Sequence, residues 1–268
     1  MPSPPPQPTR SGPAVALMYH AIGEGAAPEG QDPHYTLDCS AFQRQLNFVD
    51  AGSGGGSARD WLAGSHGARV LLTFDDGHIS NYQYAFPALA TRGMGADFFV
   101  NPANVGRPGF ASWRQLREMS DAGMSIQSHG YDHLYLTSLG TDALRASLRA
   151  AREEISQQIG KPVTLLAPPG GRMPRNLCAL ARECGYTHVL SSRPGLIAAG
   201  ATGMVLPRMA VTAATGDAEL QSWIAGDSTT VVRERLRYAG LALAKRLLGD
   251  ARYERARARA LAALRGTS

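Results

Sequence analysis

Six short apolar runs, separated by stretches with helical periodicity, constrain the fold of this chain more than any other feature. Each run has the length of a buried strand and ends in polar residues or glycine. The runs cover residues 15–20, 69–74, 96–100, 124–127, 163–166 and 187–191. Helical patterns lie between them at 40–49, 80–92, 112–122, 141–159 and 174–184. This alternation is typical of parallel strands joined by crossover helices, and roughly six to eight such units predict an α/β fold, a distorted or incomplete (β/α) barrel.

Side chains that carry chemistry directly follow several of these runs. Asp75 and Asp76 end the second run, His129 and His133 follow the fourth, and His20 ends the first. In a parallel barrel the carboxyl ends of the strands meet at one face, where active sites are built. The sequence therefore predicts one site assembled from these positions.

Length and composition indicate a globular protein. At 268 residues, with 44% hydrophobic and 18% charged residues, the chain is predicted to be one catalytic domain with short extensions. Its three cysteines, Cys39, Cys178 and Cys184, are odd in number and lack a CxxC spacing. They indicate neither a disulfide framework nor a zinc ribbon, and they favour buried thiols in a reducing compartment.

Both ends of the chain are predicted to be extensions of a domain that spans residues 14–211. Residues 1–13 are rich in proline and are predicted to be a disordered lead-in. They contain no apolar signal-peptide core, which favours a cytoplasmic location. Residues 212–268 are predicted to be a basic, helical C-terminal extension.

Positive charge is concentrated in that extension. Residues 229–268 carry ten Arg and Lys against three Asp and Glu, a balance of +7, which leaves −2 for the rest of the chain. An acidic body argues against a nucleic-acid surface. The helical pattern over 229–264 combines an apolar stripe with many arginines, so peripheral contact with an anionic membrane face and docking on the barrel both stay open. The sequence does not indicate an oligomeric state.

The glycine-rich stretch at 52–56 resembles a phosphate-binding loop only superficially. It lacks the GK[ST] ending, and no strand leads into it. We therefore predict a flexible connector there, without a function.

The carboxylate pair and the histidine pair together predict a metal site. Two imidazoles four residues apart suit a divalent ion such as zinc, cobalt or nickel, and a carboxylate oxygen supplies a third ligand. Each pair alone has a plainer interpretation, because His129 and His133 are common surface residues and Asp75-Asp76-Gly77 can cap a helix. Since both pairs end buried strands, one aspartate as ligand and the other as base is the combined prediction.

The sequence Thr73-Phe-Asp-Asp-Gly77, followed by Ser128-His129-x-x-x-His133, resembles the polysaccharide deacetylase family, that is, the NodB-homology or carbohydrate esterase family 4 domain. The resemblance covers residues 14–211. It implies a distorted (β/α) barrel and a divalent metal, zinc first, with cobalt and nickel as alternatives. It also implies that Asp76, His129 and His133 bind the metal and that Asp75 is the base.

Two further stretches, Leu17-Met-Tyr-His20 and Leu206-Pro-Arg-Met209, are similar to the subgroup that acts on bacterial exopolysaccharides. That similarity implies that His20 is the general acid, although a histidine at a strand end is, by itself, more often a core residue. The remaining histidines are unassigned: His34, His66, His78 and His188.

The third motif of the family departs from its usual form. Where many members have Arg-x-Pro-Tyr-Gly, this chain reads Ala167-Pro-Pro-Gly-Gly171. The resemblance implies that the N–H of Gly170 faces the oxyanion and that Arg208, in preference to Arg172, holds the base. Tyr131, inside the histidine motif, is assigned to the substrate or to orienting the base. The Asp and Trp of the fourth motif are not recognisable at 191–195.

The resemblance implies metal-dependent hydrolysis of the N-acetyl group of a sugar in a glycan or exopolysaccharide, with acetate and an amino sugar as products. Two alternatives remain open. One is a deacylase of a lipid-linked amino sugar, which the absence of a signal peptide favours. The other is a catalytically weak, glycan-binding relative, which the altered third and fourth motifs suggest.

Overall fold

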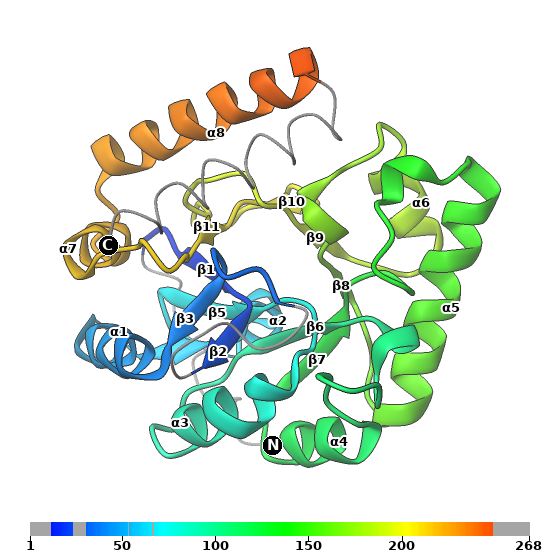
Figure 1. The fold of residues 1–268 in the computed structure, drawn as a ribbon, viewed down its shortest axis with the longest axis horizontal. Coiled ribbons are helices and arrows are strands. Elements are labelled where there is room, and N and C mark those ends of the chain that lie inside the picture. The colour runs from blue at the N-terminus through cyan, green and yellow to red at the C-terminus, as the bar shows by residue number, and fades with distance from the viewer. Residues whose placement is uncertain (1–11, 24–30, 53, 66, 249–268) are drawn as a thin grey trace, which may run out of the picture.

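A curled sheet of parallel strands forms the centre of the computed structural model, and helices ring its outer face (Figure 1). The structure describes residues 12–23, 31–52, 54–65 and 67–248, and side chains only up to residue 241. Along the sheet the strand order is β10-β9-β8-β7-β6-β5-β1-β11, with β4 also beside β5. The strands are β1 Val15–Tyr19, β4 Gly55–Gly56, β5 Val70–Phe74, β6 Asp97–Val100, β7 Ser125–Ser128, β8 Leu165–Leu166, β9 His188–Leu190, β10 Val205–Leu206 and β11 Met209–Ala210.

The barrel is incomplete at one seam. The ends of the strand order, β10 and β11, are joined through only Pro207 and Arg208, yet no ladder pairs them in the part of the chain described above. A separate two-stranded sheet, β2 (Ala21–Gly23) with β3 (Thr36–Asp38), lies beside the main one. The predicted distorted or incomplete (β/α) barrel is therefore confirmed.

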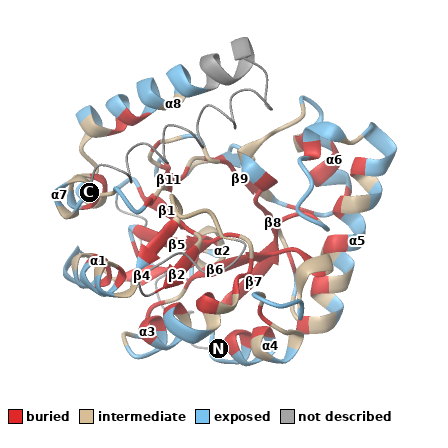
Figure 2. Cartoon of the chain, in the orientation of Figure 1, coloured by how far each residue is buried: buried red, intermediate tan, exposed pale blue. Residues whose placement is uncertain are grey.

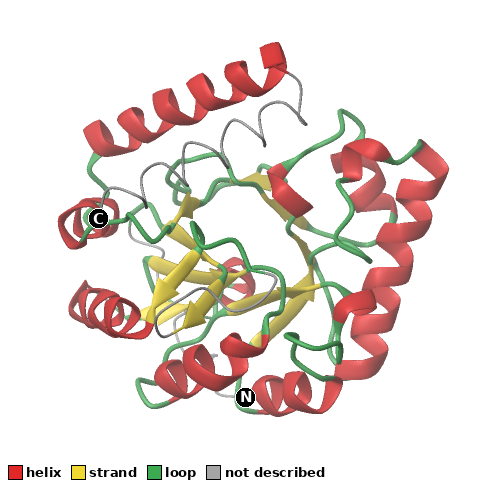
Figure 3. Ribbon diagram, in the orientation of Figure 1, coloured by secondary structure: helices red, strands yellow, loops and turns green. Residues whose placement is uncertain are grey.

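Helices surround this sheet (Figure 3). They are α1 Cys39–Gly52, α2 Ala58–Ala63, α3 Phe86–Ala90 after a π-helical turn at Asn81–Ala85, α4 Trp113–Asp121, α5 Thr141–Ile159, α6 Leu177–Glu183, α7 Asp217–Ile224 and α8 Ser228–Leu248. The predicted helices at 40–49, 112–122 and 141–159 are present. The helix α2 and the strands β10 and β11 were not predicted because each is too short for a clear period, whereas α7 lies within the predicted helical extension.

The glycine-rich stretch is not simply a flexible connector, and the prediction there was wrong. Gly55 and Gly56 form β4, which pairs with Val70 and Leu71 of β5. A Cβ atom on Gly55 would lie 2.6 Å from Cδ1 of Leu72, so a larger residue would require that buried side chain to shift. The glycine is required by close packing.

The strands bury both faces, as Figure 2 shows by their colour. Val70, Leu72 and Phe74 belong to the larger cluster of core residues, and Leu71 belongs to a second cluster with Phe99. Because alternate residues of a strand share a face, Thr73 and Asp75 point the same way as Leu71. The second face of β5 thus changes from apolar to polar towards the carboxyl end of the strand.

The C-terminal helices lie against the barrel. Helix α7 packs on α1, and α8 follows it along the rim (Figure 1). Val231 and Glu234 of α8 are buried, and Arg235 donates a hydrogen bond to the carbonyl of Pro194. The first turns of the predicted basic segment therefore dock on the barrel.

The rest of that segment cannot be compared with the prediction. Residues 249–264 lie outside the described residues, as do residues 1–11 of the predicted lead-in. Val232 and Leu236 of α8 are exposed, and contact with a membrane face stays a prediction. Among the described residues, no helix has the length and apolar character needed to span a membrane.

Asp97, at the start of β6, is fully buried and should give the protein a pH-dependent stability. Burial raises its pKa from 3.8 to about 6, although the backbone N–H groups of Ala58 and Arg59 bind the carboxylate. Between these two pH values the folded protein keeps a proton that the unfolded chain has lost. The free energy of unfolding should therefore decrease as pH rises from about 4 to 6, by on the order of 3 kcal/mol.

In Asp97→Asn this dependence should be absent. Urea unfolding at several pH values measures it, with Asp121→Asn, at the exposed end of α4, as the matched control. If the free energy of unfolding of Asp97→Asn still decreased with pH as in the wild type, other groups would cause the dependence.

Candidate active site

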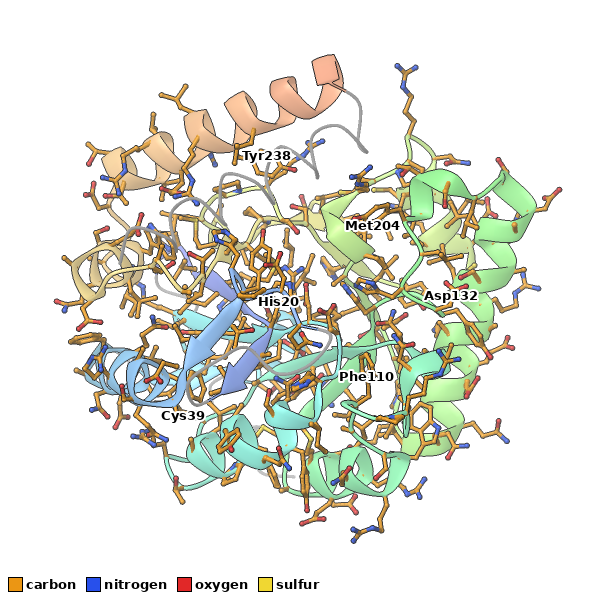
Figure 4. The ribbon with its side chains drawn as sticks, viewed as in Figure 1. His20, Cys39, Phe110, Asp132, Met204 and Tyr238 are labelled. Carbon is orange, nitrogen blue, oxygen red and sulfur yellow. The ribbon has the colours of Figure 1, made fainter. Side chains whose placement is uncertain are left out.

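A pocket of about 480 Å³ opens at the carboxyl ends of the strands, and six predicted site residues line it. They are His20, Asp75, Asp76, His129, His133 and Gly170. Figure 4 shows His20 near the middle of the barrel, with Tyr238 of α8 beyond it on one side. The pocket therefore unites residues from the ends of β1, β5, β7 and β8, with one wall from α8.

Asp76 lies between the two histidines. Its Oδ1 atom is 3.2 Å from Nε2 of His129 and 3.1 Å from Nε2 of His133. The histidines reach it from a loop, not from a helix, because His133 has a φ of 63°. Asp76 has a φ of 74°, also in the left-handed region that residues other than glycine rarely adopt. Backbone strain at two of the three residues is typical of a functional site.

The three side chains fit a divalent metal. One ligand atom from each lies within 4.8 Å of the others. Two ligands at about 2.0–2.1 Å from a tetrahedral ion are separated by about 3.3 Å, close to the measured nitrogen–oxygen separations. Burial opposes ionisation of Asp76, but hydrogen bonds with His129 and His133 hold the pKa of that carboxyl well below its ordinary value. The cluster thus offers one carboxylate oxygen and two imidazole nitrogens, a donor set that suits zinc, cobalt or nickel.

Asp75 is held by a buried arginine. Arg208 donates from Nη1 to Oδ1 at 2.7 Å and from Nη2 to Oδ2 at 2.8 Å, and neither residue is more than 2% exposed. Burial alone would raise the pKa of Asp75, but the charge and hydrogen bonds of Arg208 lower it below its ordinary value. Asp75 is therefore ionised at neutral pH, and its carboxylate is oriented by the bidentate contact with Arg208.

The two candidate arginines are thus distinguished by position. Arg208 lies in the seam between β10 and β11 and also bonds Oγ1 of Thr73 and the carbonyl of Ser191. The guanidinium of Arg172 lies 4.0 Å from the ring centroid of Tyr135, at the pocket rim. The contact with Asp75 belongs to Arg208.

His20 is fixed by its backbone and by stacking. Nδ2 of the buried Asn81 donates to the His20 carbonyl at 2.7 Å, and the Tyr35 ring lies 4.5 Å from the imidazole, tilted by 31°. Its Nδ1 atom is buried and, in the described part of the chain, has no hydrogen-bond partner. Burial lowers the pKa of His20, against the attraction of the Asp76 and Asp75 carboxylates.

Gly170 and Gly171 bring the loop after β8 close to its neighbours. Both have positive φ, 60° and 67°. A Cβ atom on Gly170 would lie 2.6 Å from Cε1 of Tyr135, and one on Gly171 would lie 2.6 Å from Oγ of Ser192. The double glycine in the altered third motif therefore has a packing reason.

Tyr131 is not brought into the pocket, and its assignment to the substrate or the base is not supported. The carboxylate of Glu154 raises the pKa of the Tyr131 hydroxyl, which it contacts by charge and hydrogen bond. The pocket lining includes Tyr135 instead, four residues later. His133, which lies between these two tyrosines, has a left-handed backbone conformation that changes the direction of the loop.

The unassigned histidines have separate surroundings. His34 lines the pocket, while the buried His78 bonds Oγ of Ser80 at 2.8 Å. His188 lies beside the hydroxyl of Thr187, and His66 is outside the described residues.

Sequence reasoning missed the pocket wall formed by α7 and α8. Trp223, Glu234, Tyr238 and Leu241 line the pocket, and no motif marks them. The last three, with the buried Val231, follow a helical period and form one face of α8. That period could have predicted that the helix packs against the domain, but not which surface of the domain the helix covers.

Removing Arg208 should destabilise the protein by about 3–5 kcal/mol, because Asp75 would remain as a buried, unpaired charge. We expect this loss for Arg208→Met in urea unfolding at pH 7. The matched control is Arg172→Met, which should lose less than about 1 kcal/mol. Adding Asp75→Asn to Arg208→Met should recover part of the loss, and equal effects of the two single arginine variants would contradict the pairing.

The apo protein should bind one zinc ion, and His133→Ala should weaken binding by at least about a hundredfold. Isothermal titration with zinc measures the affinity directly. His34→Ala changes a histidine of the same pocket outside the cluster and should leave the affinity unchanged. If His133→Ala retained wild-type affinity, the ion would be held elsewhere.

Comparisons with known proteins agree with this geometry. Residues 64–189 match the family model described as polysaccharide deacetylase. YxkH of Bacillus subtilis (strain 168) is 32% identical over 126 residues, 47% of this chain and 45% of that protein. The peptidoglycan-N-acetylmuramic acid deacetylase PdaA of the same organism is 26% identical over 181 residues, 64% and 66% of the two chains. This chain spans about half the length of YxkH.

Solved structures share the fold. IcaB from Ammonifex degensii is 25% identical, with a TM-score of 0.66 over 81% of this chain and 97% of that chain. The Streptococcus pyogenes deacetylase PplD, in complex with acetate, is 23% identical, with a TM-score of 0.69 over 76% and 94%. Together with the family match over residues 64–189, these structures show that this chain is similar in sequence to the polysaccharide deacetylase family over that segment and shares its fold.

Proposed function

We propose that this protein is a metal-dependent hydrolase that removes N-acetyl groups from an N-acetylated sugar in a glycan. The observation that carries the proposal is one pocket that holds the cluster of Asp76, His129 and His133 beside the arginine-bound carboxylate of Asp75. Three ligands leave positions open for a substrate, as catalytic metal sites require.

The metal site and the base have separate tasks in this mechanism. A divalent ion, when bound by the cluster, supplies Lewis acidity that polarises the acetyl carbonyl. Asp75 accepts a proton from the attacking water, and Arg208 keeps both carboxylate oxygens oriented for that transfer. Because Asp75 is buried and ionised, its charge is screened little by solvent.

Two further groups complete the hydrolysis. Gly170 lines the pocket, and its N–H is the proposed donor to the oxyanion that forms when water attacks the carbonyl carbon. His20 then donates a proton to the amine as the carbon–nitrogen bond breaks, which yields acetate and a free amino sugar. Burial lowers the pKa of His20, which makes its imidazolium a stronger acid but a smaller fraction of the population at neutral pH, while the nearby Asp76 and Asp75 carboxylates favour the protonated form.

The substrate is proposed from the site and the relatives together. IcaB shares the fold over most of its own length, and PdaA is named for deacetylation of peptidoglycan N-acetylmuramic acid. Both the family and the polar pocket support an N-acetylated glycan. A catalytically weak relative would lack a ligand or the base, and this chain retains Asp75 and all three residues of the cluster.

Purified protein with added zinc, cobalt or nickel should release acetate from N-acetylglucosamine oligomers. Asp75→Asn should lower kcat by about a hundredfold to ten-thousandfold, because it removes the base while an amide can still accept hydrogen bonds from Arg208. Enzymatic determination of acetate measures the rate, and Asp121→Asn, outside the pocket, should retain it.

Two outcomes would count against the proposal. One is a wild-type rate in Asp75→Asn. The other is no acetate release from any N-acetylated sugar by protein that demonstrably binds the metal.

A further inference from the structure

Tyr135 is a large aromatic residue at the pocket rim. Its side chain is 40% exposed, and it lines the same pocket as His20, Asp75 and the metal cluster. Among the described residues, the other exposed large hydrophobic side chain in the pocket lining is Leu241 of α8. An exposed aromatic ring beside a polar, catalytic cavity is positioned to contact a ligand.

The Tyr135 ring is held from two loops. On its own loop, the backbone N–H and the hydroxyl of Ser138 both donate to the Tyr135 carbonyl, at 2.9 and 2.7 Å, and the following Leu136 is buried. From the loop after β8, Gly170 leaves the space that the ring occupies, since a Cβ atom there would lie 2.6 Å from the ring. The backbone of Tyr135 is therefore fixed by hydrogen bonds, and its ring occupies the space that Gly170 leaves.

Arg172 completes this arrangement. Its guanidinium carbon lies 4.0 Å from the ring centroid, within the range of a cation–π contact. The contact covers one face of the ring, yet two fifths of the side chain is still exposed. An aromatic surface bordered by polar groups matches a pyranose ring, which has apolar C–H faces and a hydroxyl-bearing edge.

The separation of Tyr135 from the metal cluster is also comparable with the size of a sugar. Tyr135 is the second residue after His133 of the metal cluster, so their Cα atoms are at most about 7 Å apart. That span is comparable with one sugar ring and its acetamido arm. Because Tyr135 and the three residues of the cluster line the same pocket, a sugar on Tyr135 would lie in the cavity that holds the cluster.

We propose that Tyr135 is the platform on which a sugar ring of the substrate stacks, with Arg172 fixing the platform. This inference rests on the proposed function and names the residue that makes the same site select acetylated sugars over other acetylated compounds. Tyr135 acts on binding, and the chemical step remains with Asp75, His20 and the metal cluster.

Kinetics with two substrates test the proposal in the zinc-loaded full chain. The first is an N-acetylglucosamine oligomer, and the second is 4-nitrophenyl acetate, which has no sugar. Tyr135→Ala should raise KM for the oligomer about two- to tenfold, with kcat little changed and the rate on the ester unchanged. Tyr135→Phe should restore the KM, because it keeps the ring. Leu134→Ala, an exposed neighbour outside the pocket lining, is the matched control.

Equal losses on both substrates in Tyr135→Ala would overturn the proposal, because the tyrosine would then act only by supporting the loop of Gly170 and His133. An unchanged KM for the oligomer would overturn it as well. Failure of the proposed function looks different, since the wild-type protein would then hydrolyse the ester and no acetylated sugar.

Discussion

The buried ion pair between Arg208 and Asp75 is the interaction on which the rest of this structure depends. The two groups lie 133 residues apart in sequence, one in the seam of the barrel and the other at the end of β5. A buried pair of this kind stabilises little by itself, but loss of one partner leaves a charge that the interior cannot solvate. The position of the seam segment between β10 and β11 and the ionisation of Asp75 are therefore linked.

Strained backbone conformations and buried polar atoms without hydrogen-bond partners are concentrated around the same pocket. Asp76 and His133 adopt left-handed conformations, and buried polar atoms without partners occur at His20, Asn81, Asn101 and His129 in the described part of the chain. Asn81 and Asn101 each bind the carbonyl of a pocket histidine through the amide nitrogen. The surrounding apolar core is well packed, so it can hold strained and incompletely bonded groups in position.

The family match at residues 64–189 covers the metal cluster and Asp75 but not the complete pocket. His20 comes from before this segment, and Trp223 and the wall of α8 come from after it, as does Arg208, which binds Asp75. Helix α8 reaches the pocket because Val231 and Glu234 are buried against the barrel. Substrate access is thus shaped by parts of the chain that the family match does not include.

The sequence by itself determined the order of strands and helices, the incomplete barrel and the placement of Asp75, Asp76, His129 and His133 at strand ends. These follow from short-range periodicity and from the rule that parallel strands share one carboxyl edge. Only the tertiary structure decided which arginine meets Asp75, that Tyr135 and not Tyr131 lines the pocket, and that α8 forms a wall. These depend on a seam where β10 and β11 form no ladder among the described residues, on the left-handed backbone conformation of His133 and on packing between distant segments, and no local pattern encodes such contacts.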